Sequence, residues 1–396
     1  SHPVTTHLNE NVEAALVTLM RHGIHHLPIV EDKTQSSKLC GMVTSGDLMR
    51  VHTPHPLRLV RDIGRSQTTQ ELIQLAHNGP SLLSKLAQEL KDVTQVGRIA
   101  SLITDACTRR LLQLMEQELG PPPMAYTWLA FGSQARLEQG LISDQDNGLL
   151  LAAEPDGNAS LYFEQLSKGV CDGLAECGYT YCNGGVMAMG KWRLSLSAWY
   201  ETFKLWIAEP EPSSVMHCSI FFDMRPIYGD FSLAEKLRHD VLTLAKDNHI
   251  FLRFLANESM SHKPPLGFFR QFVQEQGGDQ THGLNLKQRG VIPVVDLARV
   301  LALSGMITAV HTEERLLAAA DKGLTSAEDA ANLIQAQRFI NRIRLEHQSR
   351  QLERGESLNH LVDPDHLSRL HRRYLRSAFN VVRAAQQALA QRFLLN

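Results

Sequence analysis

A short segment between two apolar runs constrains the fold of this chain more than any other feature. Residues 131–147 read FGSQARLEQGLISDQDN, in which a Gly-Ser turn precedes Asp144 and Asp146. The aromatic-rich run at 126–131 and the apolar run at 148–152 predict two buried strands that bracket it. Side chains at positions i and i+2 of a strand share one face, so we expect the two carboxylates to lie side by side.

The same segment predicts a site for a phosphate and a divalent metal. Gly132 lets the backbone approach a phosphate, Ser133 adds a hydroxyl donor, and Arg136 offers a bidentate fork to phosphate oxygens. Mg²⁺ or Mn²⁺ prefers oxygen ligands, and one or two carboxylates commonly hold it together with substrate phosphates. The alternative is a plain turn followed by a solvated loop. Because both halves occur in this order, the sequence favours a nucleoside triphosphate site with the metal on Asp144 and Asp146.

Asp223 is our candidate for a third acid in this site. It stands in the segment CSIFFDMRP at 218–226, which we interpret as an apolar, strand-like run that ends in one acid and one base. A carboxylate in so apolar a run costs free energy unless it is paired or bound to a metal. We therefore predict that Asp223 completes the catalytic and metal-binding set. The alternative is an ion pair between Asp223 and Arg225 at the end of the strand.

These motifs resemble the DNA polymerase β-type nucleotidyltransferase superfamily. Within it, the chain is similar to the bacterial CBS-linked nucleotidyltransferase family, which is related to the protein-PII uridylyltransferases. The resemblance rests on residues 121–123, Trp128, 132–136, 143–147, 182–187, 191–193 and 223–230. It implies an α/β catalytic domain of the polymerase β type that uses Mg²⁺ or Mn²⁺ on Asp144, Asp146 and Asp223. Ala135 departs from the pattern, because relatives commonly have glycine at that place.

The resemblance implies transfer of a nucleoside monophosphate, of the uridylyl or adenylyl type, from a nucleoside triphosphate to a hydroxyl group on a protein or small molecule. Lys191 and Arg193 would add contacts to the nucleotide, since Trp192 between them is expected to point to the opposite face. The alternative is a signalling module that binds the nucleotide without turnover. A third reading, RNA cleavage by the helical part, rests only on the spacing of Arg342 and His347.

Residues 1–55 have the layout of one CBS (cystathionine β-synthase) repeat. A helical stretch, two apolar strand-like runs and a second helix start follow one another between Leu8 and Asp47. In CBS modules the residues that correspond to Thr44 and Asp47 would contact an adenosine nucleotide, although the same two residues could merely cap the second helix. Only one repeat is visible, so we expect it to be one half of a truncated pair.

We expect three further parts after the CBS repeat. Helical spacing over 69–119 indicates that 56–120 is a helical linker, and the strand pattern places the nucleotidyltransferase domain at 121–232. Residues 233–396 show almost no strand pattern. Amphipathic stretches occur there at 297–303, 327–345 and 367–394, which favours an antiparallel helical bundle.

The family resemblance implies that this last domain binds substrate. A helical bundle beside the sheet would close the cleft and present the acceptor. Lys287, Arg289 and Arg299 are the cations that could face that cleft, although basic residues on a helix are often simply solvated.

Composition restricts the partners. A formal net charge of −2 over 396 residues supplies no bulk attraction to nucleic acid or to an anionic membrane. No apolar run reaches the length of a membrane span and the first residues lack the pattern of a signal peptide, so we expect a cytoplasmic protein. We also expect a homodimer.

The six cysteines lack the spacings of a zinc module, and we expect reduced, buried thiols at Cys171, Cys177 and Cys182.

Overall fold

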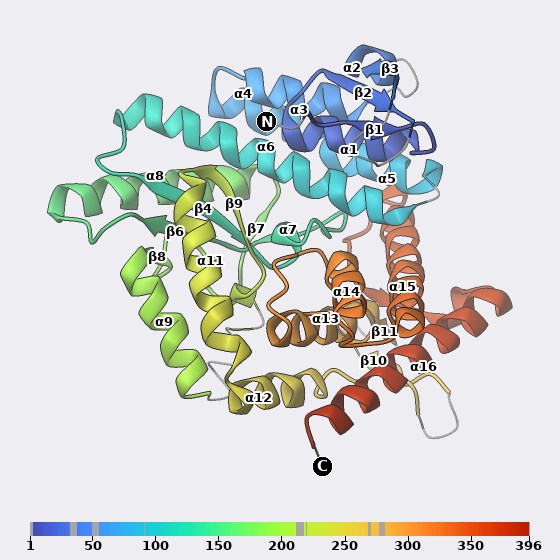
Figure 1. Ribbon diagram of the computed structural model, residues 1–396. Helices are drawn as coiled ribbons and strands as arrows, with labels where there is room; N and C mark the ends of the chain where they lie inside the picture. Colours follow the sequence, from blue (N-terminus) through green and yellow to red (C-terminus); the bar gives the residue numbers. More distant parts are fainter. Residues whose placement is uncertain are drawn as a thin grey trace.

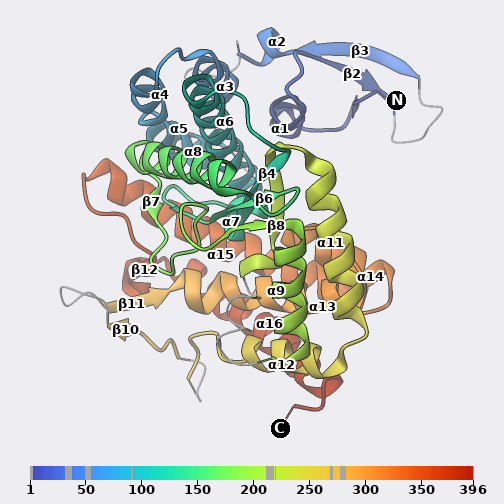
Figure 2. The ribbon, with the colours of Figure 1, turned by 90° about the vertical axis from the view of Figure 1, so that its left-hand side faces the viewer.

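The computed structural model describes residues 3–31, 38–49, 55–90, 92–210, 218, 220–267, 271–276 and 282–395. A four-stranded sheet lies between helices on both of its faces, and a helical C-terminal part packs against one edge of this unit (Figures 1 and 2). In the part of the chain just defined, no helix is both long and apolar enough to cross a bilayer.

The central sheet has the strand order β8-β6-β4-β9. Strand β4 (Tyr126–Phe131) pairs antiparallel with β6 (Asn147–Leu151) and with β9 (Met224–Gly229), and β8 (Arg193–Ser195) lies parallel to β6. Both strands predicted around the Gly-Ser segment are confirmed, the second to within one residue at each end. Because β6 and β9 run antiparallel to β4, the residues just before each of them meet the residues just after β4.

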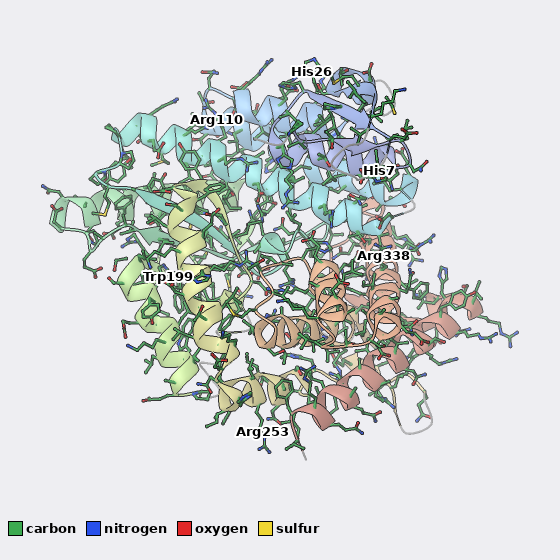
Figure 3. The ribbon with its side chains drawn as sticks, viewed as in Figure 1. His7, His26, Arg110, Trp199, Arg253 and Arg338 are labelled. Atoms are coloured by element: carbon green, nitrogen blue, oxygen red, sulfur yellow. The ribbon has the colours of Figure 1, made fainter. Side chains whose placement is uncertain are left out.

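The two faces of the sheet belong to two different hydrophobic cores. Trp128 and Leu149 pack into one core, whereas Leu129 and Leu150 pack into the other, as the alternation of side chains along a strand requires. Trp199 is fully buried, and its indole Nε1 donates to the carbonyl oxygen of Leu149 at 3.1 Å (Figure 3). The covering helices are α6 (Val93–Leu119) and α8 (Gly157–Glu176) on the first face and α9 (Leu196–Ala208) and α11 (Phe231–Lys246) on the second.

The N-terminal part has the predicted order of helix, strand, strand and helix. The Asn11 side chain caps α1 by accepting from the Ala14 N–H at 2.7 Å, and Gly23 ends the helix with φ at 61°. The sheet has the order β1-β2-β3, with β1 parallel and β3 antiparallel to β2. Its elements are β1 (Thr6–His7), α1 (Val12–His22), β2 (His26–Val30), β3 (Leu39–Thr44) and α2 (Ser45–Met49).

Helices connect this part to the sheet. The helical stretch expected at 69–119 is confirmed and consists of α4 (Thr69–Ala76), α5 (Gly79–Glu89) and α6. The segment before this stretch is also helical, because Pro56–Arg65 forms helix α3 with proline at its first position. Residues of α1, α3 and α6 share one core, so the N-terminal part packs directly on the long helix that covers the sheet.

The C-terminal part is mainly helical, as predicted, but it also contains three short strands that the sequence pattern missed. They form an antiparallel sheet in the order β10-β11-β12, and each has only two to four residues, too few for an alternating pattern to be recognised. A π-helical turn at Lys287–Val291 leads into α13. The elements are α12 (His249–Ser259), β10 (Glu275–Gln276), β11 (His282–Asn285), α13 (Ile292–Ser304), α14 (Thr312–Asp321), α15 (Ala327–Glu353), β12 (Leu361–Val362) and α16 (Arg369–Arg392).

Candidate active site

Gly132 lies at the meeting point of three strand ends. The N–H of Phe131 donates to the carbonyl oxygen of Asp146 at 2.9 Å, and the N–H of Gly132 donates to the carbonyl oxygen of Asp223 at 3.1 Å. Gly132 has φ at 55°, and a Cβ at this position would lie 3.1 Å from Oδ2 of Asp146. Glycine is therefore favoured by the backbone conformation, and a larger residue would crowd the carboxylate of Asp146.

The two neighbours of Asp146 anchor the segment so that both carboxylates face the same way. Gln145 and Asn147 are each only 2% exposed. Gln145 Nε2 donates to the carbonyl oxygen of Cys171 at 3.0 Å, and Asn147 Nδ2 donates to Oε1 of Gln145 at 3.2 Å. Asp144 and Asp146 alternate with these buried amides, and the prediction that they lie together is confirmed.

The thiol of Cys182 lies close to the two carboxylates. One oxygen of Asp144, one oxygen of Asp146 and Sγ of Cys182 all lie within 4.8 Å of one another. This position of Cys182 was not predicted, since we expected it to be a buried thiol like Cys171 and Cys177. All six cysteines are free, and Cys182 is only half-buried. The available signal was that Cys182 opens one of the segments on which the family resemblance rests.

The electrostatics of this group fit a hard divalent cation. Burial, and then the negative charge of Asp144, raise the pKa of Asp146 to about 6. Burial, and then the charge on Asp146, raise the pKa of the Cys182 thiol to about 11. A bound Mg²⁺ or Mn²⁺ would neutralise the repulsion between the carboxylates, with carboxylate oxygens as the ligands these ions prefer. Asp144 and Asp146 therefore suit such an ion.

These carboxylates open into a cavity of about 390 Å³ between the catalytic segment and the C-terminal helices. One wall comes from the Gly-Ser turn and the residues that follow it, and the other comes from α12, α13, α15 and the π-helical turn. Its charged and polar lining consists of Ser133, Arg136, Glu138, Asp144, Asp146, Glu258, Ser259, His262, Lys287, Asp296, Arg299 and Arg344.

Asp223 is placed differently from the prediction. Its side chain is fully buried, and its two oxygens accept from Arg136 Nη1 at 2.6 Å, Arg299 Nη2 at 2.7 Å and Arg315 Nη1 at 2.5 Å. Burial alone would raise the pKa of Asp223, but Arg299, then Arg315 and Arg136 outweigh it and hold that pKa well below its usual range. The carboxylate thus joins the sheet to α13 and α14, and a catalytic or metal-binding role for Asp223 stays a prediction.

The segment around Asp223 differs from the prediction in two further ways. Cys218, Ile220 and Phe221 are helical, so strand β9 begins only at Met224, after the acid. The alternative ion pair between Asp223 and Arg225 is also wrong, because Arg225 Nη1 pairs with Asp105 Oδ2 at 2.7 Å. The strand-like pattern misled here because an apolar run this short does not distinguish a buried helical turn from a strand.

Arg225 holds the turn after Gly132 in place. Its Nε donates to the carbonyl oxygen of Ala135 at 3.1 Å, and its Nη2 donates to the carbonyl oxygen of Gln134 at 2.9 Å. Asp105 on α6 orients the same guanidinium and also accepts from Gln134 Nε2 at 3.0 Å. Ala135 is 1% exposed, so the turn that Arg225 holds is tightly packed.

Three family models match consecutive parts of the chain. The CBS domain matches residues 1–53, Putative nucleotidyltransferase DUF294 matches residues 77–213, and the Putative nucleotidyltransferase substrate binding domain matches residues 249–393. The chain is a CBS-linked member of this nucleotidyltransferase family. The predicted resemblance is thereby confirmed at the level of the family and its three parts. No curated protein matches the chain.

The nucleotidyltransferase match contains the Gly-Ser turn, both carboxylates and Cys182, whereas Asp223 lies between the second and third matched ranges. The substrate-binding match contains Lys287, Arg299 and Arg344, which line the opposite wall of the cavity. The cavity therefore lies between a nucleotidyltransferase domain and its substrate-binding domain. The narrower assignments, to the polymerase β-type fold and to the domain boundaries given above, stay predictions.

Three other predicted site residues, Lys191, Arg193 and Arg289, are not among the described residues that line the cavity. Lys191 is exposed, with its Nζ 4.8 Å from the centre of the Trp192 ring, and Arg193 Nη1 donates to Ser167 Oγ at 3.2 Å. Of the three cations expected at the cleft, Lys287 and Arg299 line it, while Arg289 pairs with Glu275 at 2.6 Å.

The CBS residues Thr44 and Asp47 bond to one another at the start of α2. Thr44 Oγ1 donates to Asp47 Oδ2 at 2.6 Å, and the N–H of Asp47 donates to Thr44 Oγ1 at 3.2 Å. This is the capping arrangement that the sequence left open as the alternative to ligand binding. Both residues are accessible, since Thr44 is half-buried and Asp47 is exposed.

Proposed function

We propose that this protein transfers a nucleoside monophosphate from a nucleoside triphosphate to a hydroxyl group on a protein or small molecule, in the manner of the protein-PII uridylyltransferases. The observation that carries the proposal is the convergence of Asp144 and Asp146 beside Gly132, at the mouth of a cavity shared with the substrate-binding domain. One wall suits a metal and a donor nucleotide. The opposite wall leaves room for an acceptor.

The residues of the first wall have distinct roles in this proposal. Asp144 and Asp146 would hold Mg²⁺ or Mn²⁺, and the ion would supply positive charge against the phosphates of the donor. Gly132 and Ser133 let the phosphates approach the backbone closely. Arg136 lines the cavity while it pairs with Glu138 at 2.9 Å, so its guanidinium can offer a hydrogen bond to a phosphate although its charge is already paired.

On the second wall, an imidazole and a carboxylate lie together. Nδ1 of His262 is 3.4 Å from Oδ2 of Asp296, and both residues line the cavity. Asp296 raises the pKa of His262 above its ordinary value. In its neutral form His262 accepts the proton of the incoming hydroxyl group as the hydroxyl oxygen bonds to the α-phosphorus and pyrophosphate leaves, while Asp296 orients the ring and stabilises the imidazolium that results.

A second candidate function is nucleotide sensing without turnover. It is favoured by the environment of Asp223, whose two oxygens are already engaged by three arginines, so that of the three predicted acids only Asp144 and Asp146 line the cavity. Such a site would still bind a metal-nucleotide complex. It would lack the acid that we predicted to complete the catalytic set.

Incubation of the protein with each α-labelled nucleoside triphosphate and a cell extract tests both candidates. Nucleotidyl transfer predicts a labelled species in one of these reactions, whose mass identifies the base and the acceptor. Asp144→Ala should abolish labelling, whereas Asp240→Ala, which removes a half-buried acid on α11 that pairs with Lys236, should leave it intact. Equal labelling by the Asp144→Ala variant would contradict the proposed metal site. Nucleotide binding without labelling from any triphosphate would favour sensing.

Adenylate control through the CBS part is also proposed. Its support is continuity of packing, since residues of α1 share a core with α6, and α6 carries the Asp105 that orients Arg225 beneath the catalytic turn. Calorimetric titration with AMP and with ATP, on the wild type and on Asp47→Ala, measures whether an adenosine nucleotide binds there. Unchanged affinity in the variant would remove Asp47 from the proposed contact. A homodimer in the cytoplasm stays a prediction.

A further inference from the structure

The cations that line the cavity fall into two classes. Arg136 and Arg299 are already neutralised, because Arg136 pairs with Glu138 and Asp223, and Arg299 pairs with Asp223 and Asp296. Arg344 and Lys287 line the same cavity but make no salt bridge with any of the described residues. Both cations share the cavity with Asp144 and Asp146, and the charge of Lys287 acts to lower the pKa of Asp146.

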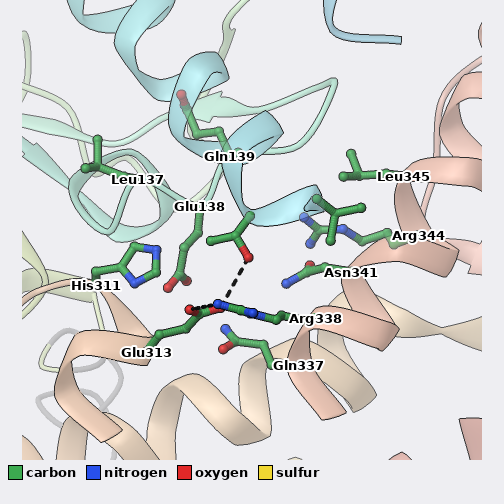
Figure 4. A pocket seen from close by; sticks show the side chains of 13 residues that line it. Leu137, Glu138, Gln139, His311, Glu313, Gln337, Arg338, Asn341, Arg344 and Leu345 are labelled. Carbon is green, nitrogen blue, oxygen red and sulfur yellow. Dashed lines mark hydrogen bonds and ion pairs between the residues drawn. The ribbon is translucent and has the colours of Figure 1, made fainter. Parts of the chain in front are cut away.

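Arg344 is the more unusual of the two. It is 6% exposed, and its Nε is buried without a hydrogen-bond partner among the described protein groups. Figure 4 shows its side chain reaching from α15 toward the loop that carries Glu138. A Cβ at Gly140 would lie 3.5 Å from Nη2 of Arg344, so the guanidinium reaches the loop that leads to Asp144.

The charge of Arg344 is compensated only in part, because Glu138 attracts it but no salt bridge joins the two residues. Burial lowers the pKa of Arg344 to about 10. The charge of Glu138 acts against this lowering, and the charge of Arg136 adds to it. The group nevertheless remains cationic at neutral pH. A buried guanidinium that no carboxylate neutralises costs folding free energy, and such groups persist where a ligand of opposite charge uses them.

We propose that Arg344, assisted by Lys287, binds the polyphosphate of the donor nucleotide from the substrate-binding domain. A planar guanidinium suits two phosphate oxygens at once, and Lys287 supplies a second point charge. The metal on Asp144 and Asp146 and these two cations would together neutralise the tail of a nucleoside triphosphate from opposite walls. This inference rests on the proposed nucleotidyl transfer, and it assigns the phosphate contacts of the second wall.

Binding of inorganic pyrophosphate in the presence of Mg²⁺ tests the inference, because pyrophosphate carries the phosphates without the base. Arg344→Met should weaken this binding by about tenfold to a hundredfold in a calorimetric titration, as expected for loss of charge-assisted hydrogen bonds. The pyrophosphate affinity of Arg344→Lys should lie between those of the wild type and Arg344→Met. Lys287→Met should weaken pyrophosphate binding less than Arg344→Met does. The matched control is Arg342→Met on the same helix, since Arg342 is exposed and pairs with Glu346 at 2.9 Å.

Thermal unfolding without ligand gives a second readout. Arg344→Met should be at least as stable as the wild type, because it removes an uncompensated buried charge, whereas loss of a structural arginine would lower the melting temperature. The inference is overturned if the variant binds pyrophosphate as well as the wild type, if it unfolds at a clearly lower temperature, or if the wild type binds no pyrophosphate. Labelled transfer by the wild type tests the proposed function separately, and its presence alongside any of these results would leave that function standing.

Discussion

Replacement of Asp223 by asparagine tests whether this acid serves the fold or the metal. The carboxylate is fully buried and pairs with three guanidinium groups, those of Arg136, Arg299 and Arg315, at 2.5 to 2.7 Å. Asparagine keeps the shape but removes the charge, so three buried cations lose their shared partner. Breaking one buried pair in this way costs about 3–5 kcal/mol, and the shared carboxylate places the expected loss toward the upper end of that range.

The assay is urea unfolding at pH 7.5, followed by circular dichroism, with Asp240→Asn as the control. Asp240 pairs with Lys236 on the surface at 3.0 Å, and an exposed i,i+4 pair contributes about 0.5 kcal/mol or less. The pKa of Asp223 is depressed in the folded state, so its contribution is present above the unfolded value of about 3.9 and is lost only as the pH falls toward the lower folded value. The difference between wild type and Asp223→Asn should therefore stay constant from pH 8 to about pH 5.

A loss of less than about 1 kcal/mol in Asp223→Asn would refute the reasoning. The same samples titrated with Mn²⁺ distinguish the two roles of the acid. If Asp223 joins the domains, the variant keeps the wild-type Mn²⁺ affinity as measured by electron paramagnetic resonance. If Asp223 is the third metal ligand, Mn²⁺ affinity falls while stability changes little, and our original prediction for this residue would be restored.

Three further predictions follow from the site. Asp146→Asn should stabilise the metal-free protein at pH 7.5 by about 1–3 kcal/mol in urea unfolding, because the raised pKa of Asp146 means that its ionisation penalises the folded state. This gain in stability should vanish below about pH 4, where the carboxyl is protonated in both states. A destabilised variant would contradict the prediction. The Mn²⁺ affinity of the wild type should fall about tenfold per pH unit below about pH 6, where Asp146 takes up a proton in the folded protein. An affinity that stays constant between pH 7.5 and pH 5 would contradict the raised pKa of Asp146. His262→Gln should lower the rate of labelled transfer by about 10²–10⁴-fold and remove the rise in rate as the pH passes through the raised pKa of His262, whereas an unchanged pH profile would exclude it as the proton acceptor.

The donor half of the site could be predicted from the sequence because it is local. Asp144 and Asp146 are two residues apart, the amides between and after them are buried, and Gly132 precedes them by one turn and one loop. Strand periodicity and the conformational freedom of glycine are properties of such short segments. They sufficed to place both carboxylates beside the turn, and the family models match the same region.

The partners of Asp223 could not be predicted in this way. Arg136, Arg299 and Arg315 stand 87, 76 and 92 residues from it, and each of the last two lies on a helix of the substrate-binding domain. Ion pairs depend on distance in space, and no periodicity links positions so far apart in the chain. The sequence pattern identified an acid in an apolar run but could not distinguish three arginines from a metal as its partner.

Cys182 and Arg344 were missed for related reasons. Cys182 reaches the carboxylates because Asn147, at the start of β6, donates its N–H to the carbonyl oxygen of Val186 at 3.0 Å, which draws the 182–187 turn toward the sheet. Arg344 lies in a long helix with many charged residues, and only its burial without a partner separates it from its exposed neighbour Arg342. Burial of a single side chain within such a helix is decided by what packs against it.

The sequence by itself determined the two strands around the Gly-Ser turn, the turn, the paired carboxylates and the family, because each depends on neighbouring residues and on short periodicities. The tertiary structure alone decided which charges are neutralised within the protein. In the folded protein, Asp223 pairs with three arginines. Arg344 and Lys287 line the cavity together with Asp144 and Asp146, and neither forms a salt bridge with a described residue. The physical reason is that electrostatic pairing and desolvation act through space, between groups that only the packing of separate domains brings together.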